Sequence, residues 1–272
     1  MPIMNPSHEK AKALLDSGMK ALREMRRADA EQAFREAVER AEGDERLHAR
    51  SLARLLYALA SQGRAHELAR TIADAARANV TRGTDEAAAL VLQSCFLRFV
   101  PAQHPETARM LAKFAAQARR LAQDVDVARA AVQVAIVSSD RGDHKGAAEL
   151  LEAALPVLER GLGGDDPEYA LALFNLADVR AALAGSYEGV LPMLRRAIAI
   201  QEATLAPGHF EKVMPLATLG LGLMRGGKPE EGRAALERAL DIAVQIEGVD
   251  GRTPQRIRAE LGKATSARNP AA

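Results

Sequence analysis

The sequence predicts an all-α fold, an α-solenoid of about six helix-turn-helix repeats followed by a C-terminal capping helix. Three observations support this fold class. A helix-turn-helix unit occurs twice between Asp166 and Gly248, and a frame of small and large apolar residues at helical spacing recurs along the chain. The third is composition: of the 272 residues, 48% are hydrophobic but only 3% aromatic, which favours helices packed closely through Ala and Leu.

The recurring frame marks the second helix of each repeat. It ends in an alanine, preceded three positions earlier by an apolar residue and four positions before that by a small or apolar residue. All three positions therefore share one helix face. In the third repeat they are Ala108, Ala112 and Ala115. The closing alanines of the six repeats are Ala37, Ala75, Ala115, Ala154, Ala197 and Ala239.

Glycines mark the turn inside most repeats, where the first helix must end. Their position predicts a left-handed cap, which glycine adopts without steric cost. The first repeat has Met25 at this place and the third has Gln103, so both depart from the pattern. An extra residue in the fifth repeat predicts a bulge or shifted turn near Ala184. The turn glycines are Gly63, Gly142, Gly185 and Gly227.

The frame and turns together set the expected boundaries. Asp166 before Pro167, and Thr84 before Asp85, supply caps for the start of a helix. A last helix, capped by Thr253, is expected to cover the apolar face of the final repeat. The expected segments are a disordered N-terminus over 1–6, repeats over 7–42, 45–80, 84–120, 124–161, 166–204 and 210–248, a capping helix over 253–266, and a tail over 267–272.

Charge and cysteine content favour a cytoplasmic protein that binds other proteins. The formal net charge of +1 gives no overall attraction for nucleic acid, and the basic cluster around Arg23, Arg26 and Arg27 lacks interleaved aromatic residues. Cys95 is the single cysteine, so no intramolecular disulfide can form. The N-terminal sequence lacks the apolar core of a signal peptide, and no apolar run approaches the ~20 residues of a membrane span.

The repeats resemble tetratricopeptide repeats. In the first, Gly18 takes the small position of the first helix, and Ala30, Phe34 and Ala37 supply the second-helix frame. The fifth and sixth are similar to the longer repeats of kinesin light chains, which are abundant in bacteria. The sequence LFNLA at 173–177 resembles the LNNLA of that family, with Phe174 in place of one Asn, and RAIAI at 196–200 resembles its RALAI. The resemblance implies a right-handed α-α superhelix whose first helices line a concave groove.

The same resemblance nominates a set of groove residues for binding a peptide or protein. Arg50 and Arg54 lie four positions apart beside Tyr57, a geometry that can hold a carboxylate through paired guanidinium hydrogen bonds. The alternative is that these arginines pair with Asp or Glu of a neighbouring repeat. The set of Lys and Asn residues by which some family members clamp a peptide carboxylate is not reproduced. The nominated residues are Lys12, Arg50, Arg54, Tyr57, Gln93, Arg129, Gln133, Phe174, Asn175, Asp178 and Thr218.

Apolar residues are expected on or near the same surface. If they are exposed, the groove suits an amphipathic helix or an extended peptide with hydrophobic anchors. Alternatively, packing within the superhelix buries them. They are Leu15, Met19, Leu90, Leu97, Val132, Ile136, Leu171, Phe174, Met214 and Leu221.

The sequence shows no catalytic constellation. The six histidines are scattered without the spacing of a zinc site, Cys95 lies in an apolar run that favours burial, and the glycine clusters lack the residues of a phosphate loop. We therefore expect no metal or cofactor and a non-enzymatic adaptor or scaffold. The alternative is a ligand- or peptide-responsive regulator of a separate effector protein, and an enzyme on a helical scaffold ranks third.

Overall fold

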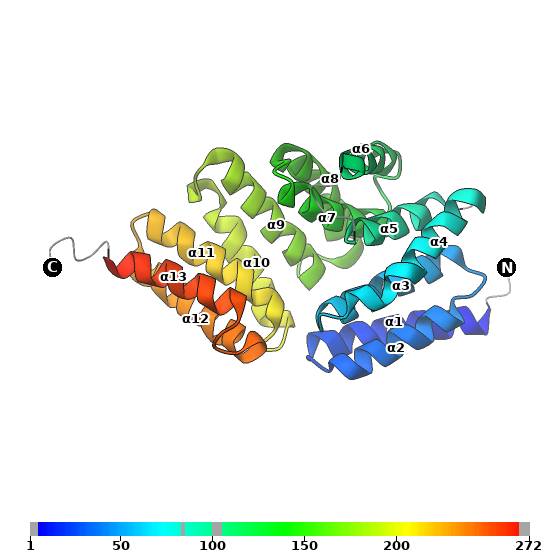
Figure 1. Ribbon diagram of the computed structural model, residues 1–272, viewed down its shortest axis with the longest axis horizontal. Coiled ribbons are helices and arrows are strands. Elements are labelled where there is room, and N and C mark those ends of the chain that lie inside the picture. The colour runs from blue at the N-terminus through cyan, green and yellow to red at the C-terminus, as the bar shows by residue number, and fades with distance from the viewer. Residues whose placement is uncertain (1–4, 83–84, 100–104, 267–272) are drawn as a thin grey trace. The chain divides into compact units, whose positions relative to one another are not determined.

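The computed structural model describes residues 5–82, 85–99 and 105–266, and every regular element in these ranges is helical (Figure 1). The chain divides into two compact units, Met1–Gly161 and Leu162–Ala272. The first eight helices are α1 (Pro6–Arg23), α2 (Arg27–Arg40), α3 (Glu45–Ala60), α4 (Ala69–Arg82), α5 (Glu86–Leu97), α6 (Pro105–Arg120), α7 (Val125–Asp140) and α8 (His144–Leu162). They are followed by α9 (Pro167–Ala184), α10 (Leu191–Thr204), α11 (Val213–Arg225), α12 (Pro229–Glu247) and α13 (Arg252–Ser266). The short 3₁₀ helices η1 (Ala65–Leu68), η2 (Glu188–Val190) and η3 (Phe210–Lys212) precede α4, α10 and α11.

Side-chain caps begin several of the helices. Asp166 accepts a hydrogen bond from the Glu168 amide and is followed by Pro167, as predicted. Asp85 caps α5, whereas Thr84 lies outside the described residues. Asn5 caps α1, so a residue that the sequence assigns to a disordered N-terminus has a structural role.

The turn glycines have the left-handed backbone that the sequence predicts. Gly63, Gly142, Gly185 and Gly227 have φ angles of 73°, 83°, 63° and 79°. After α3, the Arg64 amide donates to the Leu59 carbonyl at 2.8 Å, the hydrogen bond that closes a Schellman motif. The bulge or shifted turn expected near Ala184 is not found: α9 runs without interruption to Ala184 and is capped by Gly185, and η2 follows at Glu188–Val190.

Met25 adopts the same left-handed conformation in the first repeat, with a φ of 61°. It is the one residue other than glycine with positive φ among those described. The turn closes as it does after α3, because the Arg26 amide donates to the Ala21 carbonyl at 2.8 Å. The backbone geometry of this turn is therefore kept even where the sequence lacks the glycine.

The second-helix frame forms the buried face of most repeats. Phe34, Leu151, Leu194 and Leu236, which occupy its central position, are at most 1% exposed. Their neighbours in the frame pack beside them as the predicted spacing requires. The other buried frame residues of α2, α8, η2, α10 and α12 are Ala30, Ala37, Ala147, Ala154, Val190, Ala197, Gly232 and Ala239.

The frame is wrong for α6. Thr107, Leu111 and Phe114 form its buried face, one position earlier than predicted, while Ala108 and Ala112 are exposed. The reason is the area that each face can remove from water. Leu and Phe side chains gain more from burial than alanine methyl groups, so they turn the helix toward its neighbours.

The second unit ends with closely packed helices. A Cβ added to Gly232 of α12 would lie 2.6 Å from the Gly220 carbonyl oxygen of α11, so these glycines allow close backbone approach. Helix α13 packs along α12 and buries Ile257 there (Figure 1). It begins at Arg252, one residue before the predicted cap, and Thr253 instead donates through its amide and hydroxyl to Glu247.

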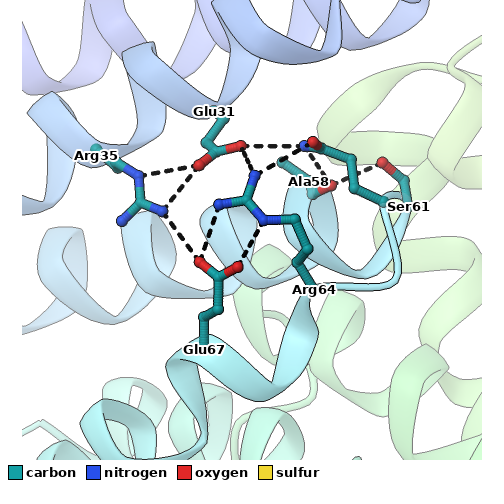
Figure 2. Close-up of polar contacts among 7 residues, drawn as sticks. Glu31, Arg35, Ala58, Ser61, Arg64 and Glu67 are labelled. Atoms are coloured by element: carbon teal, nitrogen blue, oxygen red, sulfur yellow. Dashed lines mark hydrogen bonds and ion pairs between the residues drawn. The ribbon is translucent and has the colours of Figure 1, made fainter.

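A network of charged groups fixes the turn after α3 against α2 (Figure 2). Glu31 of α2 accepts hydrogen bonds from Arg35, Arg64 and Gln62 at 2.8, 2.8 and 3.2 Å. Arg64 also donates to Glu67 at 2.6 and 3.0 Å. Burial raises the pKa of Glu31, but the hydrogen bonds outweigh it and lower the pKa below the ordinary carboxyl value. The network therefore stabilises the junction between the first two repeats.

Among the described residues, no helix combines the length and the apolar character that crossing a membrane requires.

Candidate functional site

Two of the predicted groove arginines meet a buried carboxylate in the first unit. Asp126 of α7 is 5% exposed. Arg50 of α3 donates to its Oδ2 through Nη2 at 2.6 Å and Nε at 3.2 Å, and Arg129 donates to its Oδ1 at 3.0 Å. Burial raises the pKa of Asp126, but the hydrogen bonds and charges of the two arginines outweigh it, so the pKa is lowered. The carboxylate is therefore held ionised between two cations.

A second arginine of α3 extends this arrangement toward the helix ends. Arg46 lies 3.3 Å from Asp85, the cap of α5, and 2.9 Å from Asp124, the cap of α7. Together with Arg50, Arg129 and Asp126, these three residues form a set of ion pairs that we call the clasp. The clasp joins α3 to α7 across the start of α5. There, Ala87 and Ala88 are buried and present only methyl groups.

The N-terminal end of α7 explains why Asp126 lies where it does. Asp124 accepts hydrogen bonds from the amides of Asp126 and Val127 at 2.9 and 3.2 Å, which begins the helix. Asp126 then stands in the first turn, where the helix dipole favours negative charge. The sequence signal for this residue is the Asp-Val-Asp run at a helix start, but its pairing with Arg50, 76 positions away, has no local signature.

One helical turn beyond the clasp, other predicted residues continue the same helix faces. Arg54 follows Arg50 by four positions on α3, and Gln133 follows Arg129 by four on α7. Both are half-buried, as is Tyr57 at the edge of the hydrophobic core. Gln133 accepts a hydrogen bond from Arg98 at 2.7 Å. We call Arg54, Tyr57 and Gln133 the first-helix surface.

The remaining nominated residues of the first unit lie apart from this surface. Lys12 is exposed on α1, where it forms an ion pair with Glu9 at 2.7 Å. Gln93 of α5 turns toward α6 and lies 3.5 Å from the Met110 carbonyl oxygen. The structure therefore does not bring Lys12 or Gln93 into one cluster with the clasp.

In the second unit, the nominated residues are mainly part of the helix packing. Phe174 is 8% exposed and Thr218 is 5% exposed. Asn175 donates to the Leu171 carbonyl of its own helix at 2.7 Å. Asp178 is exposed on α9. Phe174, which replaces an asparagine of the kinesin-light-chain pattern, is therefore a buried side chain of the hydrophobic core.

Half of the ten apolar residues expected near the groove are buried, as the second of the two alternatives has it, and the other half keep some exposure. Met214 differs, with 42% of its surface exposed. Met19, Ile136, Leu171 and Leu221 are half-buried. The buried members are Leu15, Leu90, Leu97, Val132 and Phe174.

No group of three or more residues able to hold a metal ion is found in the described part of the chain. Cys95 is buried, and burial raises the pKa of its thiol to about 11. Because the thiolate is the reactive form, this cysteine serves as a small apolar side chain of the core.

A family model described as tetratricopeptide repeat matches residues 126–203, which run from α7 into α10. No curated protein sequence matches the chain. Among solved structures, BtubC (BKLC) from P. vanneervenii superposes with a TM-score of 0.54 and 16% sequence identity, covering 93% of this chain and 92% of that one. A P. anserina protein named for kinesin light chains, with nearly identical TPR-like repeats, gives a TM-score of 0.37 and 16% identity, with coverages of 89% and 98%. The similarity to BtubC shows the fold.

Proposed function

Because the chain carries tetratricopeptide repeats, we propose that it is a non-enzymatic adaptor or scaffold that binds a peptide or protein segment along its first helices. The observation that supports this most directly is the first-helix surface beside the clasp. Repeats of this family generally mediate protein–protein interactions, and Arg54, Tyr57 and Gln133 offer a partner an aromatic ring, a guanidinium group and an amide.

The clasp contributes to this function by fixing the surface in advance. Arg50 and Arg129 are already bonded to Asp126, so they orient α3 and α7 rather than receive the partner's carboxylate. A surface whose helices are held before binding loses little conformational entropy on association. We therefore place the partner contacts one turn further along, at Arg54, Tyr57 and Gln133.

A pair of matched charge reversals tests this proposal. A photo-cross-linking amino acid placed at position 133 in the native host first identifies the partner. The purified segment of that partner is then titrated against the full-length protein to measure affinity. Arg54→Glu is expected to weaken binding at least tenfold, in the range of an interface hot spot. Arg109→Glu reverses the same charge on α6, where the Arg109 side chain is 82% exposed, and should leave affinity unchanged. Equal effects of the two variants would reject the first-helix surface.

The clasp also gives the regulator alternative a specific basis. An acidic ligand that competes with Asp126 for Arg50 would have to open the clasp, which would release α3 from α7. A switch of this kind requires a ligand that binds the two states with different affinity. Small-angle scattering with and without an acidic peptide measures the change, and an Asp126→Asn variant should resemble the ligand-bound profile. Identical profiles in all three samples would exclude this regulator.

A further inference from the structure

A cavity of about 390 Å³ lies between α6, α7 and α8 in the first unit. Its buried floor includes Ala128 and Ala131 of α7, and its exposed sides include Ala112 of α6 and Ala153 of α8. We call this cavity the alanine trough. On α6 the trough is lined mainly by small residues, among them Ala108, Ala112 and Ala115 of the predicted frame.

One end of the trough carries a buried polar group. Ser138 of α7 is 2% exposed and lines the trough. Its hydroxyl forms no hydrogen bond with any residue in the described ranges, whereas the buried hydroxyls of Ser51 and Ser94 donate to carbonyls of their own helices at 2.8 and 2.7 Å. Because Ser138 lines the trough, its hydroxyl can donate to or accept from a polar atom of a ligand there.

Charged groups stand beside the same end. Arg141 lines the trough there and supplies guanidinium donors. Asp143 also lines it, but one of its oxygens accepts a hydrogen bond from the Gly146 amide at 2.9 Å and so begins α8. Ser138 and Arg141 can both donate hydrogen bonds, so this end favours an acceptor such as a carboxylate.

An ion pair limits the shape of the occupant. Arg119 of α6 and Glu149 of α8 both line the trough, and their side chains meet at 3.2 Å. The pair lies on the solvent-facing side of the trough, because 69% and 51% of the two side chains are exposed. A partner helix about 10 Å wide would have to displace this pair, whereas a thin chain needs less room beside it.

We propose that the alanine trough binds a linear aliphatic carboxylate, with the chain on the alanines and the head beside Ser138 and Arg141. A water-sized group occupies ~30 Å³, so the trough holds roughly a dozen non-hydrogen atoms, the size of decanoate. The volume and the apolar lining are those of small-molecule sites. This site is separate from the first-helix surface and does not depend on a protein partner.

A chain-length series tests the fit of the ligand. Calorimetric titration of the full-length protein with hexanoate, octanoate, decanoate and tetradecanoate, each below its micelle concentration, gives the affinities. Affinity should rise by about fourfold per methylene group until the trough is full, at roughly ten to twelve carbons, and then level off. The absence of saturable binding, or a rise that continues to tetradecanoate, would overturn the proposal.

Two matched substitutions on the exposed side of α6 locate the site. Ala112→Leu fills the trough and should weaken decanoate binding at least tenfold. Ala116→Leu makes the same change at an exposed position of α6 outside the trough and should leave binding unchanged. Neither position is buried, so both variants are expected to fold, which circular dichroism checks. Equal affinities of the two variants would place decanoate elsewhere and overturn the assignment.

The head-group position has its own test. Ser138→Ala removes the hydroxyl without adding volume and should weaken decanoate binding by about threefold to tenfold, as expected for the loss of one hydrogen bond. The measurement is the same titration. An affinity equal to that of the unmodified protein would show that the carboxylate does not lie beside Ser138.

Discussion

The left-handed turn at Met25 predicts an unusual order of stability between two variants at this position. At this position, glycine should stabilise the protein relative to alanine, the reverse of their order inside a helix. An L-residue with left-handed backbone costs about 1–2 kcal/mol, and glycine avoids that cost while losing ~0.5–1 kcal/mol of chain entropy on folding. The expected advantage of Met25→Gly over Met25→Ala is therefore about 1 kcal/mol.

The comparison with alanine matters because Met25 itself is half-buried. Met25→Gly loses the contacts of that side chain as well as the backbone strain, so its stability relative to the original protein mixes two effects of opposite sign. Met25→Ala loses nearly the same contacts and keeps the strain. The difference between the two variants therefore measures the backbone contribution alone.

Gln32 provides the matched control. It is exposed in the middle of α2, where the helix prefers alanine over glycine by ~1 kcal/mol. Urea unfolding followed by circular dichroism gives the midpoint for all four variants, with the slope checked for constancy because repeat proteins can depart from two-state behaviour. Glycine should be preferred at 25 and alanine at 32. A preference for alanine at both positions would refute the left-handed turn.

Three further predictions concern packing, reactivity and pH. Gly232→Ala should lower the free energy of unfolding by about 1–3 kcal/mol, because the new methyl group meets the α11 backbone. Gly262→Ala is the control: its Cβ meets nothing within 4 Å, so this variant should raise the free energy of unfolding in the same urea assay. Equal shifts of the two variants would contradict the close packing of α11 and α12. Cys95, with a pKa of about 11, should resist iodoacetamide at mildly alkaline pH until urea unfolds the protein, and rapid alkylation of the native protein would argue against its burial. The lowered pKa of Asp126 contributes stability that is fully present above its unfolded value of about 4 and is lost as pH falls below it. Asp126→Asn should therefore destabilise the protein near neutral pH, and the variant should lose less stability than the original protein when the pH is lowered. Thermal melts over a pH series measure both effects. If the variant loses as much stability in acid as the original protein, the clasp is not the source of the acid dependence.

The sequence predicts the turns well because each depends on a few adjacent residues. Gly63, Gly142 and Gly227 stand where a first helix must end, and the left-handed backbone follows from local sterics alone. Met25 shows the limit of that signal. The turn still closes through the hydrogen bond from the Arg26 amide to the Ala21 carbonyl, so its geometry persists where the glycine is missing.

The orientation of α6 was not predictable from the alanine frame. In an alanine-rich chain, small residues fall at helical spacing by chance, and a methyl group buries too little area to orient a helix. Leu111 and Phe114, one position away, decide the buried face instead. Residue size was thus a better guide here than spacing.

The candidate site was predicted only in part. Arg50 and Arg129 were nominated from the family resemblance, and the sequence left open whether Arg50 pairs with an acidic residue of a neighbouring repeat. Arg50 does pair with an acid, but that acid is Asp126, which lies two repeats further along the chain and not in the neighbouring repeat. Such a pairing depends on how closely α3 and α7 approach across the small residues of α5, which no short-range pattern encodes.

The alanine trough has a consequence for how the protein opens. In a linear array each repeat is held mainly by its neighbours, so stability varies along the chain with the quality of each interface. Atoms that line an empty space lose part of their dispersion energy, which makes the junction of α6 with α7 and α8 a weak one. Backbone amides of α6 should therefore exchange with deuterium through local opening, earlier than those of α3 and α7, which the clasp joins. A ligand that fills the trough would slow that exchange, so the same space sets both where the array first opens and how its opening can be controlled.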